Sequence, residues 1–333
     1  MSSIRNTFFL QTFKVKGYAI AAAALAFILL SGFSAFHFFK NEEKEIAGKP
    51  AVYEMGEKRR PLEVYTFEKP AEALFAGEPA PLHIDEVWER LDYELHLNVY
   101  FHSNTIALIK RSYRWLPEIA EVLKKYAIPD DFKYLPLIES GLQNVVSPRQ
   151  AVGFWQLRES TARELGLEVT KQVDERYDPI RSTEAASQYL LKAYEKFGSW
   201  TLAAAAYNMG IKGLSRTLNE QRVDSYYDLL LNEETARYIY RILAIKEILN
   251  RPAAYGYDIP KSHMYQKASI RRIVVDEDIK DLAVFAKEQG VNYKVLKKFN
   301  PWLRDRALNV RKGKSYEIQL PLDVEAYMAA PSL

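Results

Sequence analysis

One carboxylate in this chain stands where acid–base chemistry would need it. Glu139 directly follows the apolar run Tyr134–Ile138, at the edge of what reads as the buried side of a helix. Burial beside apolar groups disfavours the charged form of a carboxyl, which raises its pKa and keeps it protonated. A protonated carboxyl in a groove is what general-acid catalysis requires, so we predict that Glu139 is a catalytic acid.

Groups suited to binding a ligand follow shortly after this carboxylate. Gly153 permits a close approach of the backbone. Trp155 offers a flat face for stacking, and Gln156 offers an amide that can both donate and accept hydrogen bonds. Further on, an Ala-rich helix expected over 200–207, narrow enough for the middle of a bundle, brings Tyr207-Asn208 to its C-terminal end.

Four short motifs follow one another in a fixed order. They are Glu139-Ser140, the Gly-x-x-Gln of Gly153 to Gln156, Ala206-Tyr207-Asn208, and Glu234-Thr235-x-x-Tyr238. Together they resemble the signatures of the lytic transglycosylase family with the goose-lysozyme-like fold, and their ordering and spacing most resemble the membrane-bound lytic murein transglycosylase D group of that family. Any one motif alone would be a weak signal, whereas four in order are a strong one.

The resemblance implies a carbon–oxygen lyase that cleaves peptidoglycan with Glu139 as its single acid and base. Glu139 would protonate the glycosidic oxygen between N-acetylmuramic acid and N-acetylglucosamine. The same group, now a carboxylate, would take the proton of the sugar's own C6 hydroxyl. That hydroxyl attacks C1 and leaves a 1,6-anhydro end, so water is not a reactant.

The resemblance also implies which residues bind the substrate. Tyr238 would hydrogen-bond Glu139 and tune its protonation, and Ser147 would hydrogen-bond the glycan or its N-acetyl group, as would the amides of the motifs. Trp155 and Tyr207 would line the groove, with a place in the core as the alternative for both aromatic rings. The predicted substrate-binding residues are Ser147, Gly153, Trp155, Gln156, Tyr207, Asn208 and Tyr238.

Glycosidases usually place two carboxylates about the scissile bond, so a glycosidase of that kind would have a second carboxylate near Glu139. None of the nearby acidic residues has a comparably apolar, motif-like context, which agrees with a single acid and base. A hydrolytic muramidase of the goose-lysozyme type, a non-catalytic peptidoglycan-binding scaffold and a generic helical adaptor remain as alternatives. The acidic residues considered are Glu159, Glu164, Asp174, Glu175 and Asp178.

Composition narrows the chemistry further. The 333 residues include no cysteine, which excludes disulfides and thiolate chemistry. The five histidines show no metal-ligand spacing, so we expect neither a metal nor a cofactor. A net charge of +3 does not point to nucleic acid. We expect a monomer.

The N-terminal part indicates export. Basic residues in segment 1–17 precede an apolar run over 18–39, long enough to span a bilayer. This pattern predicts a cytoplasmic N-terminus and a transmembrane anchor, with a cleaved signal peptide as the alternative. Either reading places the body outside the cytoplasm, in the cell envelope or periplasm. The charged, Pro-dotted segment 40–82 is predicted to be a linker.

The pattern over 83–260 predicts an all-α domain, and the resemblance implies that this domain is lysozyme-like and catalytic. Apolar residues recur at helical spacing from Ile84, and helices are expected over 105–113, 117–126, 180–197, 200–207, 228–231 and 234–249. We find no strand pattern before residue 260. The overall fold class is therefore mainly α, with one small α/β module behind the helical domain.

That module is expected over 265–323. Strand patterns at 270–275 and 315–320 flank two short helical patterns at 279–288 and 295–299. This βααβ order, ending in Ile-x-Leu-Pro, resembles a LysM peptidoglycan-binding module, although Val275-Asp276-Glu277-Asp278 stands where the family has a Gly-Asp-Thr turn. Basic side chains clearly outnumber acidic ones over 261–314, which suits an anionic polymer.

Overall fold

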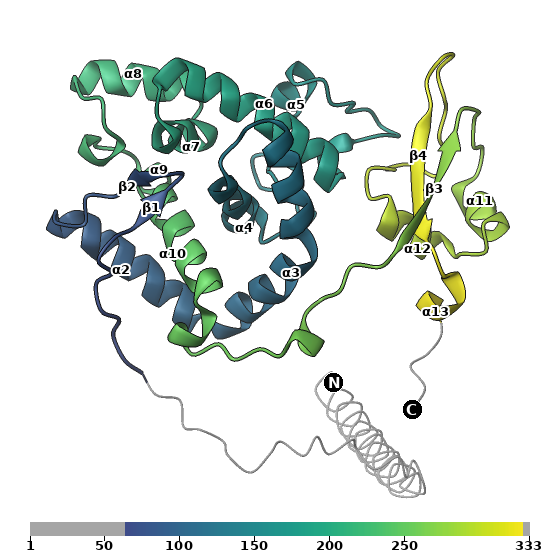
Figure 1. Cartoon of the computed structure of the whole chain (residues 1–333). Helices are drawn as coiled ribbons and strands as arrows, with labels where there is room; N and C mark the ends of the chain where they lie inside the picture. The colour runs from purple at the N-terminus through teal and green to yellow at the C-terminus, as the bar shows by residue number, and fades with distance from the viewer. Residues whose placement is uncertain (1–63, 329–333) are drawn as a thin grey trace, which may run out of the picture. The chain divides into compact units, whose positions relative to one another are not determined.

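The structure of the chain is a computed structural model that describes residues 64–328, and the described residues from Thr66 onward belong to one compact unit. Most of this unit is a body of helices, shown in Figure 1. Within the described part, the helices of the body are α2 (Asp85–Tyr100), α3 (His102–Lys125), α4 (Leu135–Ser140), α5 (Glu159–Glu164), α6 (Pro179–Phe197), α7 (Trp200–Met209), α8 (Ile211–Gln221), α9 (Glu233–Ala236) and α10 (Tyr238–Asn250).

The body is built around α7 and α10. Helix α7 packs on α6, and the side chains of Ala203–Ala206 have no exposed surface. Alanine lets neighbouring helices approach closely, so this helix fits the interior as its composition predicted. Helix α10 packs on α2, α7 and the short helix α4, which Figure 1 shows between α3 and α10.

Helix α3 corrects one prediction. Two helices were expected over 105–113 and 117–126, but a single helix runs from His102 to Lys125 with Pro117 inside it. A proline there lacks the N–H that would bond the carbonyl of Tyr113. The ring of Pro117 is exposed, whereas Leu108 and Ile119 on the other face are buried. Tertiary packing on both sides of the proline therefore holds the helix together.

The body also begins earlier than predicted and contains strands. Strands β1 (Leu74–Phe75) and β2 (Glu78–Pro79) form an antiparallel hairpin inside the segment expected to be a linker. Phe75 is fully buried. The Glu78 carboxylate accepts hydrogen bonds from the first N–H groups of α7, those of Trp200 (2.6 Å) and Thr201 (2.8 Å). The prediction of no strand before residue 260 is wrong, as is a linker that reaches residue 82.

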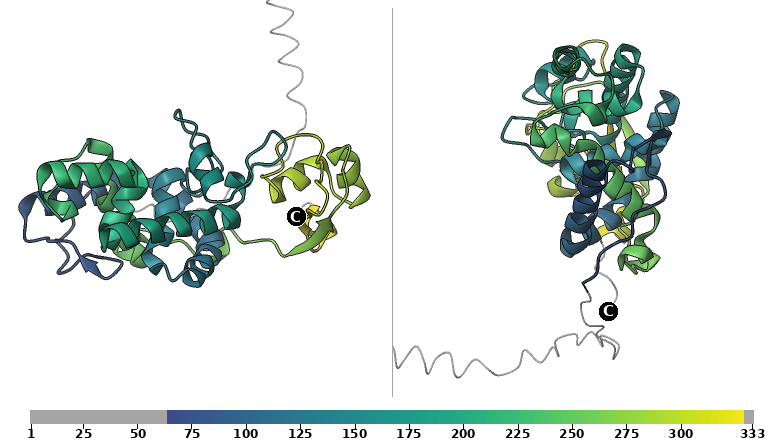
Figure 2. Two further views of the ribbon diagram at one scale, coloured as in Figure 1. Left: turned by 90° about the horizontal axis from the view of Figure 1, so that it is seen from above. Right: turned by 90° about the vertical axis from the view of Figure 1, so that its left-hand side faces the viewer.

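The C-terminal module has the predicted βααβ order. Strands β3 (Ile270–Val275) and β4 (Tyr316–Pro321) pair antiparallel, with Ile270 opposite Pro321. Helices α11 (Leu282–Glu288) and α12 (Tyr293–Phe299) lie between them in sequence, and α13 (Val324–Met328) follows. The left view of Figure 2 shows these segments, light green to yellow, as a small cluster of strands and helices. The module has its own buried core, centred on Leu296 and Ile318.

A loop of the body completes that core. Val173 is buried among the side chains of the module and forms an isolated antiparallel bridge with Leu303. The next N–H, that of Asp174, donates to the carbonyl of Trp302 (2.9 Å). Tyr316 and Lys314 of the module both bond the carboxylate of Glu168. The module is therefore fastened to the body through segment 168–174.

The N-terminal predictions concern residues that the structure does not describe. Segments 1–17 and 18–39, and the linker up to residue 63, lie outside the described residues. Within residues 64–328, no helix combines the length and apolarity needed to cross a membrane.

Candidate active site

Glu139 lies near the C-terminal end of α4, whose preceding residues form a wholly buried stretch. Leu135 to Ile138 are buried, and Gly141 ends the helix in the left-handed conformation with φ 62°. The carboxyl of Glu139 is itself half-buried. The short apolar helix thus carries Glu139 up to the edge of the core and stops there, as the sequence predicted.

Tyr238 holds the carboxyl of Glu139. Its hydroxyl donates to Oε1 of Glu139 over 2.5 Å, and its side chain is only 1% exposed. Tyr238 is the first residue of α10, 99 positions along the chain. The predicted hydrogen bond between these two residues is present.

Burial raises the pKa of Glu139, because the protein around the carboxyl replaces water that would stabilise its charge. The hydrogen bond from Tyr238 and the positive charge of Arg241 act in the opposite direction, and the charge of Glu234 adds to the increase. A carboxyl with a raised pKa keeps its proton closer to neutral pH. Glu139 is therefore suited to act as a general acid.

The second motif forms a tight loop beside this helix. Isolated antiparallel bridges join Val152 to Val146 and to Leu157. The Oγ of Ser147 accepts from the N–H of Ala151 (3.0 Å), so Ser147 closes a turn of this loop. Ser140, next to Glu139, donates to the carbonyl of Phe154 (2.8 Å) and ties the loop to α4.

Gly153 is required by sterics. Its φ is +81°, and a Cβ at this position would lie 2.0 Å from the carbonyl oxygen of Arg176. The close backbone approach expected of Gly153 is therefore made to the carbonyl of Arg176, within the 3-10 helix Glu175–Tyr177. Gln156, also at positive φ (48°), donates through Nε2 to the carbonyls of Gly153 (2.8 Å) and Val145 (3.2 Å). Its amide oxygen is the end left for a ligand.

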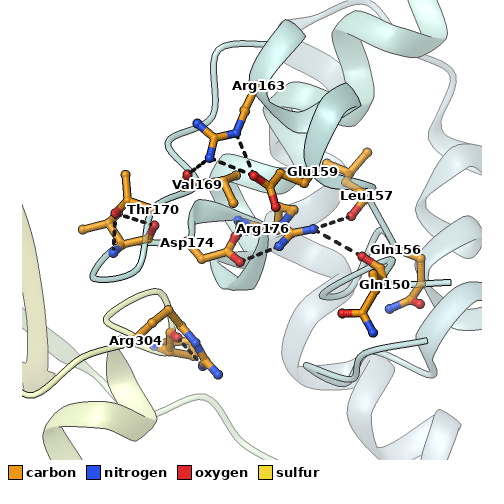
Figure 3. Close-up of polar contacts among 12 residues, drawn as sticks. Gln150, Gln156, Leu157, Glu159, Arg163, Val169, Thr170, Asp174, Arg176 and Arg304 are labelled. Atoms are coloured by element: carbon orange, nitrogen blue, oxygen red, sulfur yellow. Dashed lines mark hydrogen bonds and ion pairs between the residues drawn. The ribbon is translucent and has the colours of Figure 1, made fainter. Parts of the chain in front are cut away.

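A buried ion pair supports this loop from behind (Figure 3). Arg176 bonds both carboxylate oxygens of Asp174, at 2.9 and 2.8 Å, and the two side chains are 8% and 9% exposed. Nη1 of Arg176 also donates to the carbonyls of Gln150 and Leu157, on either side of the motif. Because Asp174 bonds the backbone of Trp302, the support continues into the C-terminal module.

Trp155 corrects a prediction. Its ring is 0% exposed, and Nε1 donates to Oγ1 of Thr183 (2.7 Å). A fully buried ring cannot stack on a sugar, so Trp155 belongs to the core. Tyr207 is partly buried, and its hydroxyl donates to the carbonyl of Trp155 (2.7 Å). Burial and then the neighbouring charge of Glu139 raise the pKa of Tyr207.

Asn208 connects the third and fourth motifs. Its Oδ1 accepts from Oγ1 of Thr235 (2.8 Å), and its Nδ2 donates to Glu234 (3.3 Å). Thr235 is buried, with 1% exposed surface. The residues that the sequence analysis selected from the four motifs are therefore joined by hydrogen bonds and packing around Glu139.

Sequence reasoning missed two residues of this site. Glu234 carries an acidic side chain close enough to influence the pKa of Glu139, yet it was not among the carboxylates considered as partners. Arg241 donates to the carbonyl of Ile138 (2.5 Å) and presents a positive charge to Glu139. Arg241 lies one helical turn after Tyr238, and this spacing could have identified it.

Four of the five carboxylates named as possible partners of Glu139 form contacts with other residues. Glu159 pairs with Arg163, and Asp174 with Arg176. Glu175 pairs with Arg181, and Asp178 accepts from two N–H groups at the start of α6. Among residues 64–328, no three His, Cys, Asp or Glu side chains come together in a way that could hold a metal ion.

Two family models match the chain. Residues 118–229 match the transglycosylase SLT domain, and residues 271–324 match the soluble lytic transglycosylase C-terminal LysM-like domain. The first range includes the predicted site residues apart from Tyr238, and the second falls on the module of β3 and β4. The matches to an SLT transglycosylase domain model and a LysM-like domain model confirm the resemblance found in the motifs.

Individual relatives agree with this. Membrane-bound lytic murein transglycosylase D of Escherichia coli (strain K12) is 28% identical over 238 residues, covering 70% of this chain and 51% of the relative. A putative tributyltin chloride resistance protein of Alteromonas sp. (strain M-1) is 31% identical over 114 residues, covering 34% and 55%. The chain is homologous to both and spans about half the length of each.

A solved structure is similar over a smaller part. The 70 kDa soluble lytic transglycosylase of Escherichia coli aligns with 44% of this chain and 26% of its own. The identity is 20% and the TM-score 0.34, too low for a comparison of folds.

Proposed function

We propose that this protein is a peptidoglycan lytic transglycosylase that uses Glu139 as its only acid and base. The observation that carries the proposal is the half-buried Glu139, which Tyr238 holds over 2.5 Å and whose pKa is raised by burial. The SLT domain match and the name of the Escherichia coli relative support peptidoglycan as the substrate. The bond cleaved is the one between N-acetylmuramic acid and N-acetylglucosamine.

The proton movements balance without water. Glu139 gives its proton to the glycosidic oxygen as the bond from that oxygen to C1 of the muramic acid breaks. The C6 hydroxyl of the same sugar attacks C1 and gives its proton back to the Glu139 carboxylate. The products are a free hydroxyl on the leaving glucosamine and a 1,6-anhydro ring on the muramic acid. Tyr238 and Arg241 would stabilise the carboxylate between the two steps.

The other motif residues would hold the sugars. The free amide oxygen of Gln156 would accept from a sugar hydroxyl or N-acetyl N–H. Asn208 would present its amide to an N-acetyl group, and Ser147 would bond the strand from the loop. The hydroxyl of Tyr207 would remain hydrogen-bonded to the carbonyl of Trp155, and Tyr207 would line the base of the groove.

We further propose that the protein acts in the cell envelope. The apolar run 18–39 would carry the chain across the inner membrane and anchor it there, or be cleaved after export. The partners are then peptidoglycan strands and the membrane, and the protein acts as a monomer. The LysM-like module would add affinity for the strands.

Release of soluble fragments from purified peptidoglycan tests the proposal. Wild-type protein should release them, and Glu139→Gln should lower the rate by about 10²–10⁴-fold, as expected for a lost general acid. Glu159→Gln is the matched control, since Glu159 is an exposed carboxylate paired with Arg163. Equal activity of wild type and Glu139→Gln would contradict the proposal. Binding without release by any variant would favour the non-catalytic scaffold.

A further inference from the structure

Glu94 is a buried carboxylate that the proposed reaction does not use. It lies on α2 with 2% of its surface exposed, less than any other acidic residue within residues 64–328. Its Oε1 accepts a hydrogen bond from Nε of Arg237 over 2.5 Å. Burying a carboxylate is unfavourable unless a cation compensates it, and a buried ion pair seldom stabilises a fold more than apolar side chains of the same size would. Stability alone therefore does not explain this pair.

Arg237 stands at the junction of two helices that carry the fourth motif. It follows α9 and directly precedes Tyr238, the first residue of α10. Among the described residues, no side chain caps the N-terminus of α10. The carbonyl of Arg237 accepts from the N–H of Arg241 (2.9 Å), so Arg237 begins the hydrogen-bond ladder of this helix. A contact that fixes Arg237 therefore also fixes the start of α10.

The other contacts of the Arg237 side chain hold it less firmly. Its guanidinium lies 5.3 Å from the ring centroid of Tyr93, which is more than half exposed. Its Nε lies 3.9 Å from the carboxylate of Glu233, whose side chain is 74% exposed. Ion pairs as exposed as this one contribute little. Glu94, buried on the helix that packs against α10, is therefore the firmest contact of Arg237.

The start of α10 carries both groups that favour the carboxylate form of Glu139. Tyr238 donates to that carboxyl over 2.5 Å, and Arg241 presents its positive charge to it. The other titratable groups whose charges act on one another with Glu139 are Glu234 of α9 and Tyr207 of α7. Hydrogen bonds between two oxygens span about 2.5–3.0 Å, so a shift of α10 by about 1 Å would break the bond from Tyr238.

We propose that Glu94 is a positioning residue for the reaction: through Arg237 it fixes the start of α10 and thereby places the Tyr238 hydroxyl on Glu139. This inference rests on the proposed function, because the position of that hydroxyl affects the rate only if Glu139 exchanges protons. Glu94 itself does not touch the reacting groups. It lies outside the four motifs and acts from α2, on the far side of the Arg237 side chain.

The test measures the pH–rate profile of fragment release, together with thermal unfolding, for two matched variants. Glu94→Ala removes the partner of Arg237. Asp131→Ala is the control, because Asp131 pairs with Lys246 farther along the same helix over 2.6 Å. We expect both variants to unfold at a lower temperature. Only Glu94→Ala should also lower kcat, by about three- to tenfold, through the weakened bond from Tyr238.

The direction of the pH shift follows from the same bond. The hydroxyl of Tyr238 lowers the pKa of Glu139, so a misplaced hydroxyl lets that pKa rise. The alkaline limb of the profile should therefore move to higher pH in Glu94→Ala and stay in place in Asp131→Ala. A loss of stability without a role in positioning would leave the limb in place in both variants.

A double variant separates positioning from a general loosening of the fold. Once Tyr238→Phe has removed the hydroxyl, Glu94 has nothing left to place. Glu94→Ala/Tyr238→Phe should therefore cleave no more slowly than Tyr238→Phe alone. If the two losses multiplied instead, Glu94 would act independently of Tyr238 and the inference would be overturned.

A second replacement keeps the test decisive if Glu94→Ala does not fold. Glu94→Leu/Arg237→Met exchanges the ion pair for apolar side chains of similar size, which proteins commonly tolerate. The same shift of the alkaline limb is expected of it. A wild-type profile in either variant would overturn the inference and leave the proposed function intact. If wild-type protein released no fragments, or if Glu139→Gln released them equally fast, the proposed function would fail and the inference with it.

Discussion

At the scale of the residue, Glu139 is held between opposing influences. Burial favours its neutral form, whereas Tyr238 and Arg241 favour the carboxylate. A group that must first give and then receive a proton needs both forms to be accessible. The surroundings of Glu139 provide this by combining an apolar helix with a hydroxyl donor and a nearby cation.

Tyr238→Phe should move the pH dependence of cleavage in a defined direction. The Tyr238 hydroxyl stabilises the carboxylate and so lowers the pKa of Glu139. Without that hydroxyl the pKa of Glu139 rises, and Glu139 stays protonated to higher pH. The alkaline limb of the pH–rate profile therefore moves to higher pH. We expect the maximal rate to fall by about tenfold, because the intermediate carboxylate loses a donor.

Tyr134→Phe is the control for this experiment. Tyr134 is also buried, but its hydroxyl bonds Asn250 instead of Glu139. The control should leave the alkaline limb unchanged. If the alkaline limb of the pH–rate profile did not shift in Tyr238→Phe, Tyr238 would have only a packing role and no effect on the pKa of Glu139.

The stability of Glu139→Gln should depend on pH. The pKa of Glu139 is higher in the folded protein than in the unfolded chain. Glu139 therefore makes its full contribution to the stability of the fold at pH values below the pKa of the unfolded chain. That contribution is lost as the pH rises through the pKa of the folded protein. An amide does not titrate. Thermal unfolding should therefore show equal stability near about pH 4 and a more stable variant at neutral and alkaline pH. A variant that is less stable at every pH would contradict the burial of this carboxyl.

At the scale of the element, the loop of the second motif is fixed by backbone contacts. Gly153 lies against the carbonyl of Arg176, whose side chain bonds the carbonyls of Gln150 and Leu157. This arrangement fixes where Gln156 stands relative to Glu139. The loop thus holds the Gln156 amide in place through hydrogen bonds to the backbone.

Gly153→Ala should destabilise the fold by roughly 3 kcal/mol, since it adds a backbone clash to an unfavourable φ. Gly166→Ala is the control: its φ is +82°, but a Cβ there meets nothing within 4 Å. That variant should lose only roughly 1–2 kcal/mol. Urea unfolding of both variants measures the difference. Equal losses would show that the contact with Arg176 is not tight.

Periodicity predicted most elements of the body but not all. The long apolar stripes gave α2, α6, α7 and α10, and the pairing of Glu139 with Tyr238 followed from the motifs. The hairpin at residues 74–79 was missed because its strands have two residues each, too few to alternate. Helix α8 was also missed, since it contains Gly213 and buries only Leu214.

Some roles depend on tertiary position and could not be read from residue type. A buried tryptophan and an exposed tryptophan that stacks on a sugar look the same in the sequence. Only the packing of α6 against the ring of Trp155 shows that this tryptophan is buried. The same holds for Glu234, which reaches the surroundings of Glu139 from another helix. Sequence identifies which groups are present, and the fold decides which of them face the groove.

At the scale of the whole molecule, the helical body and the C-terminal module share residues. Val173 belongs to the body in sequence and to the core of the module in space. Asp174, next in the chain, bonds both the backbone of Trp302 and the side chain of Arg176, which supports the loop of Gly153. The module is thereby linked through few contacts to the loop that carries Gln156.

The central claim is that Glu139 directs an internal attack by the sugar and that water takes no part. The most direct measurement is mass spectrometry of the products formed from peptidoglycan in water enriched with heavy oxygen. We expect wild-type protein to release fragments with 1,6-anhydro-muramic ends that contain no heavy oxygen, and Glu139→Gln to release none. Reducing ends that carry heavy oxygen would contradict the account, because they would show hydrolysis and call for a second carboxylate near Glu139.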